Sequence, residues 1–216
     1  MLNGKTCPPI AMPIKSPSDT LSAPRSPRVV VFAGPNGAGK STHADAILAT
    51  LGIEIFVNAD FIAKGLSGRN TQAVAFEAGR IMLRRLRQLA AAQEDFAFET
   101  TLSSRTFAFF LRRLKAQGYR VAIYYFSLAN PQLAVRRVKL RVALGGHDVR
   151  PEVVRRRFVR SVDNFFSLYA PLADEWTLFD NSAPPQAKLV AAQVAHRLTV
   201  MEPTTWHKLQ KPRPAD

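Results

Sequence analysis

The residues with the clearest chemical meaning form one glycine-rich stretch. Residues 34–41 read Gly-Pro-Asn-Gly-Ala-Gly-Lys-Ser and match the pattern G-x-x-x-x-G-K-[S/T] in full. Because glycines lack a Cβ, such a loop can turn successive backbone N–H groups toward one anion, and a following helix adds partial positive charge. The stretch therefore predicts a phosphate-binding loop; a glycine-rich turn that matches by chance is the alternative.

The residue types in this loop indicate a nucleoside triphosphate as the ligand. We expect Lys40 to reach the β- and γ-phosphates and the hydroxyl of Ser41 to hold Mg²⁺. Nothing in the chain fits the dinucleotide-binding pattern G-x-G-x-x-G with an acid about 20 residues further on. The predicted nucleotide-binding residues are Gly34, Pro35, Asn36, Gly37, Ala38, Gly39, Lys40, Ser41 and Thr42.

Three acidic residues, Asp60, Glu99 and Asp180, stand at the ends of predicted strands. In an open parallel sheet, ligands bind beyond the carboxyl ends of the strands. Asp60 could instead cap a short helix that begins near Phe61, and Asp180 could close a turn. Glu99 ends so apolar a run that it needs a metal, a water or a hydroxyl as its partner.

Two acids with separate tasks would suit phosphoryl transfer to an alcohol. One acid accepts the hydroxyl proton, and the other organises the metal. We assign the catalytic base to Asp60 and a metal or substrate role to Glu99. The sequence contains no distances, so the two roles could be exchanged.

The positive charge of the chain is concentrated in one segment. The net charge is +14, and residues 105–160 hold fourteen basic residues against two acids. A charge of this size suggests a polyanionic partner such as nucleic acid. Two predicted helices that carry Arg141 and Arg155–Arg157 could instead close over a triphosphate, with Gly145 and Gly146 as their hinge. A solvated helix face is the third interpretation.

The elements that must position these residues alternate along the chain. Apolar runs predict strands at 28–33, 54–58, 95–99, 120–128 and 175–180. Helical spacing and helix-end signals predict helices at 39–51, 72–92, 105–117, 131–144, 151–169 and 186–200. This order predicts an α/β fold: a P-loop three-layer α/β/α sandwich with a mostly parallel five-stranded sheet and a helical, Arg-rich lid at about 131–160.

The length of 216 residues predicts one folded domain, at 28–200. Six prolines predict a disordered segment at 1–27, and 201–216 reads as a loose tail in which Trp206 could dock. Cys7 has no partner for a disulfide, and His147 has no partner for a metal site. Without a membrane-spanning run or a signal peptide, we expect a cytoplasmic protein.

With these residues in place, the chain resembles the zeta toxin family of P-loop kinases. The resemblance covers about residues 28–197. It rests on the phosphate loop through Thr42, Val57-Asn-Ala-Asp60, Phe98-Glu-Thr-Thr-Leu-Ser103, Gly118-Tyr-Arg-Val121, Arg141-Val-Ala-Leu-Gly-Gly-His147, Arg155–Arg157 and Asp180-Asn-Ser182.

The resemblance implies a nucleoside-kinase-like fold and a phosphotransferase that uses ATP and Mg²⁺ with an alcohol as acceptor. Known members phosphorylate a hydroxyl of UDP-N-acetylglucosamine and are restrained by a small antitoxin, so a sugar nucleotide and an antitoxin are the implied partners. A nucleic-acid-associated P-loop NTPase that uses residues 105–160, and a non-catalytic nucleotide switch, are the alternatives.

By the same resemblance, the family's functional residues fall on particular positions of this chain. The base falls on Asp60, the Glu-x-Thr element on Glu99 and Thr101, and the clamping arginines on Arg141 and Arg157. Arg156 is the alternative to Arg157. In the Gly-Gly-His branch of the family we expect a proline directly after Val149, whereas this chain has Arg150 before Pro151.

Overall fold

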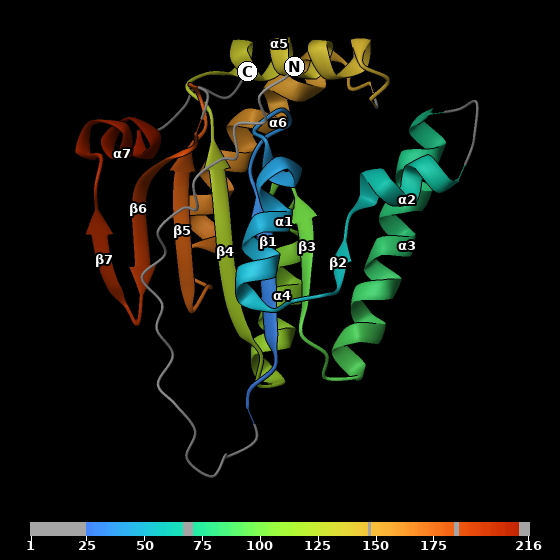
Figure 1. Cartoon of the computed structure of the whole chain (residues 1–216), viewed down its shortest axis with the longest axis vertical. Coiled ribbons are helices and arrows are strands. Elements are labelled where there is room, and N and C mark those ends of the chain that lie inside the picture. Colours follow the sequence, from blue (N-terminus) through green and yellow to red (C-terminus); the bar gives the residue numbers. More distant parts are fainter. Residues whose placement is uncertain (1–24, 67–70, 147, 184–185, 212–216) are drawn as a thin grey trace, which may run out of the picture.

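Figure 1 shows the computed structural model of the chain, which describes residues 25–66, 71–146, 148–183 and 186–211. Residues 1–24 of the predicted disordered segment at 1–27 lie outside the described residues, and so does His147.

The order of strands and helices follows the predicted alternation through β5. The strands are β1 Arg28–Ala33, β2 Phe56–Val57, β3 Phe96–Thr100, β4 Arg120–Ser127, β5 Glu175–Asp180, β6 Lys188–Val194 and β7 Arg197–Val200. The helices are α1 Lys40–Leu51, α2 Ala59–Gly65, α3 Thr71–Ala91, α4 Thr106–Ala116, α5 Pro131–Ala143, α6 Pro151–Asn164, the π-helical turn η1 Phe165–Tyr169 and α7 Pro203–Gln210.

The strands form one sheet in the order β2-β3-β1-β4-β5-β6-β7. The first five strands of this order are parallel, while β6 and β7 are antiparallel to their neighbours. Residues 29–33 of β1 are all buried, which explains why this central strand is apolar along its whole length. The predicted α/β fold with a mostly parallel sheet is confirmed, but the sheet has seven strands where we expected five.

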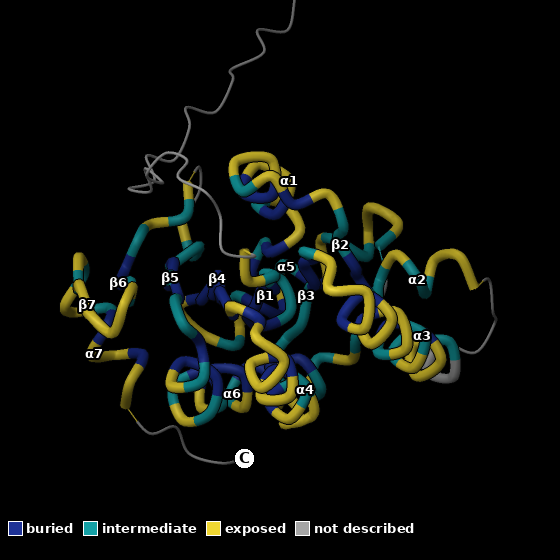
Figure 2. Tube along the Cα trace, turned by 90° about the horizontal axis from the view of Figure 1, so that it is seen from below, coloured by how far each residue is buried: buried dark blue, intermediate teal, exposed yellow. Residues whose placement is uncertain are grey.

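Helices cover both faces of the sheet. Figure 2 shows α1 on one face and α4 and α6 on the other. Figure 1 shows α5 lying across the carboxyl ends of the central strands, close to the start of α6. Asn130 caps α5 by accepting from the backbone N of Leu133, and proline occupies the first turn of both α5 and α6. Helices α5 and α6 thus begin near the carboxyl ends of the central strands, the edge of the sheet where the predicted site residues lie.

The predicted helix at 186–200 is wrong. Residues 188–200 form the hairpin of β6 and β7, and Ala195 and His196 turn between the strands with φ of 49° and 63°. The run Ala-Ala-Gln-Val-Ala favours a helix by intrinsic propensity, but pairing with β5 buries Val190 and Ala191 completely. Tertiary pairing therefore overrides local preference.

The expectation of a loose tail is also wrong for residues 203–210, which form α7. Trp206 is 8% exposed, and its ring stacks on Trp176 of β5 with centroids 5.7 Å apart. Phe166 contacts the same indole edge-on at 5.4 Å. The helix therefore covers part of the sheet beside β6.

Within the described residues, no helix is both long and apolar enough to cross a bilayer.

Candidate phosphoryl-transfer site

The glycine-rich loop connects β1 to α1 and takes a backbone path that excludes side chains at two positions. Gly34 and Gly39 have φ of 136° and 81°, which L-residues with a Cβ rarely adopt. A Cβ on Gly34 would overlap the carbonyl oxygen of Phe126, and one on Gly39 would overlap the side-chain amide of Asn181. The loop is thus held between β4 and the segment after β5.

Lys40 is 6% exposed and folds back across the loop. Its Nζ donates to the carbonyl oxygen of Pro35 at 3.1 Å and lies 3.4 Å from Oε1 of Glu99. These two partners compensate for the burial of an ammonium group, which would otherwise be costly. The ammonium is therefore fixed beside the loop, where an approaching phosphate would meet it.

Glu99, near the end of β3, connects the loop to the neighbouring strands. Its Oε2 accepts from the hydroxyl of Ser41 at 2.6 Å and from Nδ2 of Asn58 at 2.9 Å. The predicted metal pair, Ser41 and Glu99, is therefore brought together. Hydroxyl and carboxylate oxygens are ligands that Mg²⁺ accepts in nucleotide sites. The described residues hold no cluster of three or more His, Cys, Asp or Glu.

Asn58 is 5% exposed and joins two parts of the site. While its Nδ2 donates to Glu99, its Oδ1 accepts from the backbone N of Asp60 at 2.8 Å and caps α2. The alternative in which Asp60 serves as the helix cap is therefore wrong, because Asn58 does so. The Asp60 side chain lies in the first turn of α2, is 46% exposed and remains available to a substrate.

Two arginines of the predicted lid segment lie near Asp60. Nη1 of Arg141 on α5 is 3.5 Å from Oδ2 of Asp60. Burial, and secondly the charge of Arg156, lower the pKa of Arg157, while Asp60 acts in the opposite direction. Arg157 is half-buried, whereas Arg155 and Arg156 are exposed. Of the consecutive arginines on α6, Arg157 is thus the one turned toward the site.

The segment after β5 contributes residues that were not predicted as site residues. Asn181 donates through Nδ2 to the carbonyl oxygen of Ala38 at 2.9 Å, and Arg137 of α5 donates to the carbonyl oxygen of Ser182 at 3.2 Å. Asp180 accepts from the backbone N and the hydroxyl of Ser182, so it closes a turn. The Asp-Asn-Ser sequence indicated that turn but not the contact with the phosphate loop.

His43 lies one turn into α1, next to this contact. Its ring stacks on Phe126 with centroids 5.0 Å apart. Burial lowers the pKa of His43 from 6.5, while the hydrogen bond with Asn181 acts in the opposite direction. The neutral imidazole is thus the form that fits between β4 and the loop after β5.

The remaining predicted residues lie at the same edge of the sheet but outside this network of contacts. Thr101 follows β3, and its hydroxyl pairs with that of Ser103 at 2.8 Å. Thr42 is exposed in the first turn of α1. Asn36 holds a buried Oδ1 without a hydrogen-bond partner within the described structure. An unsatisfied acceptor beside the loop is consistent with a bound ligand that donates to it.

The chain is similar to known proteins. The Zeta toxin family model matches residues 15–178, which is more than half of the chain. The chain belongs to the Zeta toxin family. An uncharacterized protein of Haemophilus influenzae (strain ATCC 51907 / DSM 11121 / KW20 / Rd) is 26% identical over 135 residues, which cover 61% of this chain and 92% of the relative.

Solved structures share the fold of this Zeta toxin family member at low sequence identity. The AvrRxo1-ORF1:AvrRxo1-ORF2 structure with sulphate ions matches with a TM-score of 0.71 at 16% identity, over 88% of this chain. This chain spans 65% of the length of that chain. A structure from the PezAT toxin-antitoxin system of Streptococcus pneumoniae matches with a TM-score of 0.51 at 15% identity, over 74% of this chain and 70% of that one. A putative kinase from Chloroflexus aurantiacus j-10-fl has the same score and identity, over 62% and 78%. These matches show a P-loop kinase fold.

Proposed function

We propose that the protein is an ATP-dependent kinase that transfers the γ-phosphoryl group of ATP to a hydroxyl of a sugar nucleotide, with UDP-N-acetylglucosamine as the substrate. One observation carries the proposal. A continuous set of contacts runs from Lys40 through Glu99 and Asn58 to the helix that bears Asp60, with Arg141 above it. This set brings a buried ammonium group, a hydroxyl–carboxylate pair and a half-exposed carboxylate paired with Arg141 to one edge of the sheet, which supports the proposal.

Each group has a role in this proposal. The loop amides and Lys40 bind the phosphates, and Ser41 and Glu99 hold Mg²⁺, which would neutralise charge on the triphosphate when bound. Asp60 accepts the proton of the attacking hydroxyl, and Arg141 and Arg157 stabilise the charge on the transferring phosphoryl group. Crystallisation of the related AvrRxo1-ORF1:-ORF2 complex with ATP supports the choice of nucleotide.

The acceptor and the partner in this proposal come from the family. The resemblance to the zeta toxin family suggests UDP-N-acetylglucosamine as the acceptor. The similar AvrRxo1-ORF1 chain was crystallised with AvrRxo1-ORF2, and the similar PezAT protein belongs to a toxin-antitoxin system. We therefore include a small antitoxin partner in the proposal. A cytoplasmic location would place the kinase beside its sugar-nucleotide substrate.

The proposal is tested with purified protein, ATP, Mg²⁺ and UDP-N-acetylglucosamine, with mass spectrometry of the nucleotide sugars. We expect a phosphorylated sugar nucleotide, and we expect Asp60→Asn to lower its rate of formation by roughly 10²- to 10⁴-fold without loss of ATP binding, because the proton acceptor is removed while the phosphate loop is unchanged. Asp45→Asn, an exposed carboxylate on α1, is the matched control.

Two results would contradict the proposal. Absence of a phosphorylated product from UDP-N-acetylglucosamine and from a metabolite extract would exclude the kinase activity. Near-normal turnover by Asp60→Asn would show that the base lies elsewhere. Bacterial growth arrest by the wild type that Asp60→Asn relieves would connect the activity to toxicity.

A further inference from the structure

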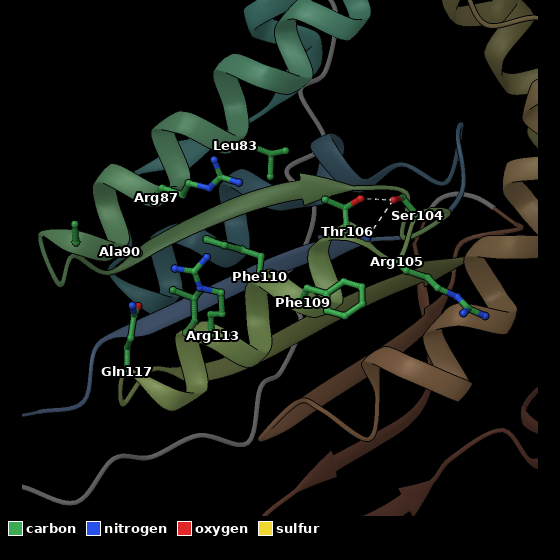
Figure 3. Close-up of a pocket in the computed structure, with 12 residues that line it drawn as sticks. Leu83, Arg87, Ala90, Ser104, Arg105, Thr106, Phe109, Phe110, Arg113 and Gln117 are labelled. Carbon is green, nitrogen blue, oxygen red and sulfur yellow. Dashed lines mark hydrogen bonds between the residues drawn. The ribbon is translucent and has the colours of Figure 1, made fainter.

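A cavity of about 570 Å³ lies between α3 and α4 and is separate from the proposed transfer site. Its walls include Leu83 and Arg87 of α3 and Phe110, Arg113 and Leu114 of α4 (Figure 3). None of the phosphate-loop residues, Asp60 or Glu99 lines it. We refer to this cavity as the α3–α4 groove. Nothing in the proposed transfer reaction uses it.

The floor of the groove is apolar. Leu114 and Ala90 are buried at its base, and Phe110 packs edge-on against Phe98 of β3 with centroids 6.3 Å apart. Phe109 stands at the rim with 64% of its surface exposed, and the guanidinium of Arg112 lies 5.7 Å from the centre of its ring. An open apolar floor with an exposed aromatic ring at its rim favours a ligand with an apolar stripe.

The charged residues that line the groove are all positive. They are Arg87, Arg105 and Arg113, and no acidic residue lines it. None of the three forms an ion pair within the described part of the chain. Figure 3 shows Arg87 and Arg113 extending from opposite helices into the space between them. Two cations that converge without a counter-ion favour a ligand with carboxylates beside its apolar stripe.

The shape of the groove favours a helical ligand. The lining residues run over 104–117, which includes all of α4, a helix roughly 16 Å long at about 1.5 Å per residue. A trough bounded by two helices can receive the apolar face of a third helix of about 12 residues. Single-stranded nucleic acid fits less well, because its bases need several stacking rings and Phe109 is the one exposed ring in the described lining.

We propose that the α3–α4 groove is the docking site for an acidic amphipathic helix of a partner protein. Its apolar residues pack on Leu83, Phe110 and Leu114, and its acidic residues pair with Arg87 and Arg113. The net charge of +14 favours an acidic partner over a second copy of this chain. The inference goes beyond the proposed phosphoryl transfer and does not depend on it.

The test is selection from a display library of peptide segments encoded by the source genome, with the full-length protein as the target. We expect selected peptides to carry apolar residues at helical spacing flanked by Asp and Glu. In fluorescence anisotropy at fixed salt, Arg87→Glu/Arg113→Glu should weaken their binding at least tenfold. Arg84→Glu/Arg85→Glu, the same charge change on exposed positions of α3 outside the groove, should leave binding within about twofold. ATP binding by both double variants confirms that they are folded.

Other outcomes overturn the proposal. Peptides that lack acidic residues, equal binding to both double variants, or no enrichment would exclude an acidic helix as the ligand. Loss of binding to a single-stranded RNA in Arg87→Glu/Arg113→Glu alone would assign the groove to nucleic acid. A dimer in sedimentation that only this variant dissociates would assign it to a second copy. Since ATP-dependent transfer is measured separately, its failure would leave the docking result intact.

Discussion

Asn58 uses both atoms of its carboxamide, one toward Glu99 and one toward the backbone of Asp60. The glycine pattern identified Lys40 and Ser41 because phosphate binding demands a local sequence. Asn58 has no such local signature. Its contact arises because Val57 pairs with Phe98 between β2 and β3, which sets Asn58 beside Glu99. The pairing partner and register of a two-residue strand are not evident from its sequence.

Replacing Asn58 separates its two contributions. We expect Asn58→Ala to destabilise the protein by about 1 kcal/mol through loss of the helix cap, and to lower turnover because Glu99 loses a donor that orients it. Asn58→Asp keeps the cap acceptor but sets a second carboxylate against Glu99, so it should retain stability better than Asn58→Ala and still lose turnover. Urea unfolding and steady-state kinetics measure the two effects.

Asn130 provides the control for this prediction, since it is also an asparagine cap, at the start of α5. Asn130→Ala should cost similar stability without the loss in turnover. Equal kinetic losses in Asn58→Ala and Asn130→Ala would mean that helix capping alone explains the role of Asn58.

His43 makes the stability of the fold depend on pH. Its folded pKa lies below the unfolded value of 6.5, mainly through burial. The unfolded state therefore binds a proton more readily. The stabilising contribution of the neutral ring is present above the unfolded pKa and is lost as pH falls through the folded pKa. We expect the melting temperature of the wild type to fall relative to that of His43→Gln between about pH 7.5 and about pH 5.

NMR titration of the assigned His43 ring should give a midpoint below 6.5. Parallel melting curves for wild type and His43→Gln across this range would contradict the prediction.

At the scale of elements, sequence patterns identified most of the fold up to β5. β1, β3 and β4 carry continuous apolar runs because both faces of a central parallel strand are buried. The hairpin of β6 and β7 departs from the predicted helix because its alanine-rich sequence lacks a strand pattern, while pairing with β5 fixes it as an extended strand. The starts of α5 and α6 follow from prolines, which act locally. Elements with local causes are therefore evident from the sequence, while those fixed by strand pairing are not.

Helix α6 offers a matched pair of adjacent arginines. Arg157 is half-buried near Asp60, while Arg156 is exposed. We expect Arg157→Gln to lower turnover by roughly 10³-fold or more, because a guanidinium that stabilises the transferring phosphoryl group is removed. Arg156→Gln should leave turnover unchanged. Single-turnover kinetics with each variant, together with ATP affinity, measure this difference. A larger loss in Arg156→Gln would reverse the assignment.

At the scale of the whole molecule, the C-terminal elements extend the sheet that holds the site. The hairpin adds two strands beyond β5, and Trp206 of α7 packs on Trp176 of that strand. β5 also leads directly into Asn181, which contacts the phosphate loop. Packing that fixes β5 therefore also fixes one support of the phosphate loop. The predicted domain boundary at residue 200 leaves out α7, whose Trp206 packs on β5.

The net charge of +14 belongs to the molecule as a whole, and the structure divides its densest segment into two groups. Arg137, Arg141 and Arg157 are half-buried around the proposed site, while most basic residues of 105–160 are exposed.

We expect the exposed group to bind single-stranded oligonucleotides weakly and without sequence preference, with most affinity lost between about 50 mM and about 200 mM salt. Because the site arginines are turned inward, such binding should not stimulate ATP turnover. Arg155→Gln/Arg156→Gln should reduce the salt dependence of binding while leaving phosphoryl transfer unchanged. Oligonucleotide titrations at several salt concentrations, with ATP turnover measured in parallel, provide the check. Stimulation of turnover by nucleic acid, or tight binding that persists at the higher salt, would favour a nucleic-acid-associated enzyme over a sugar-nucleotide kinase.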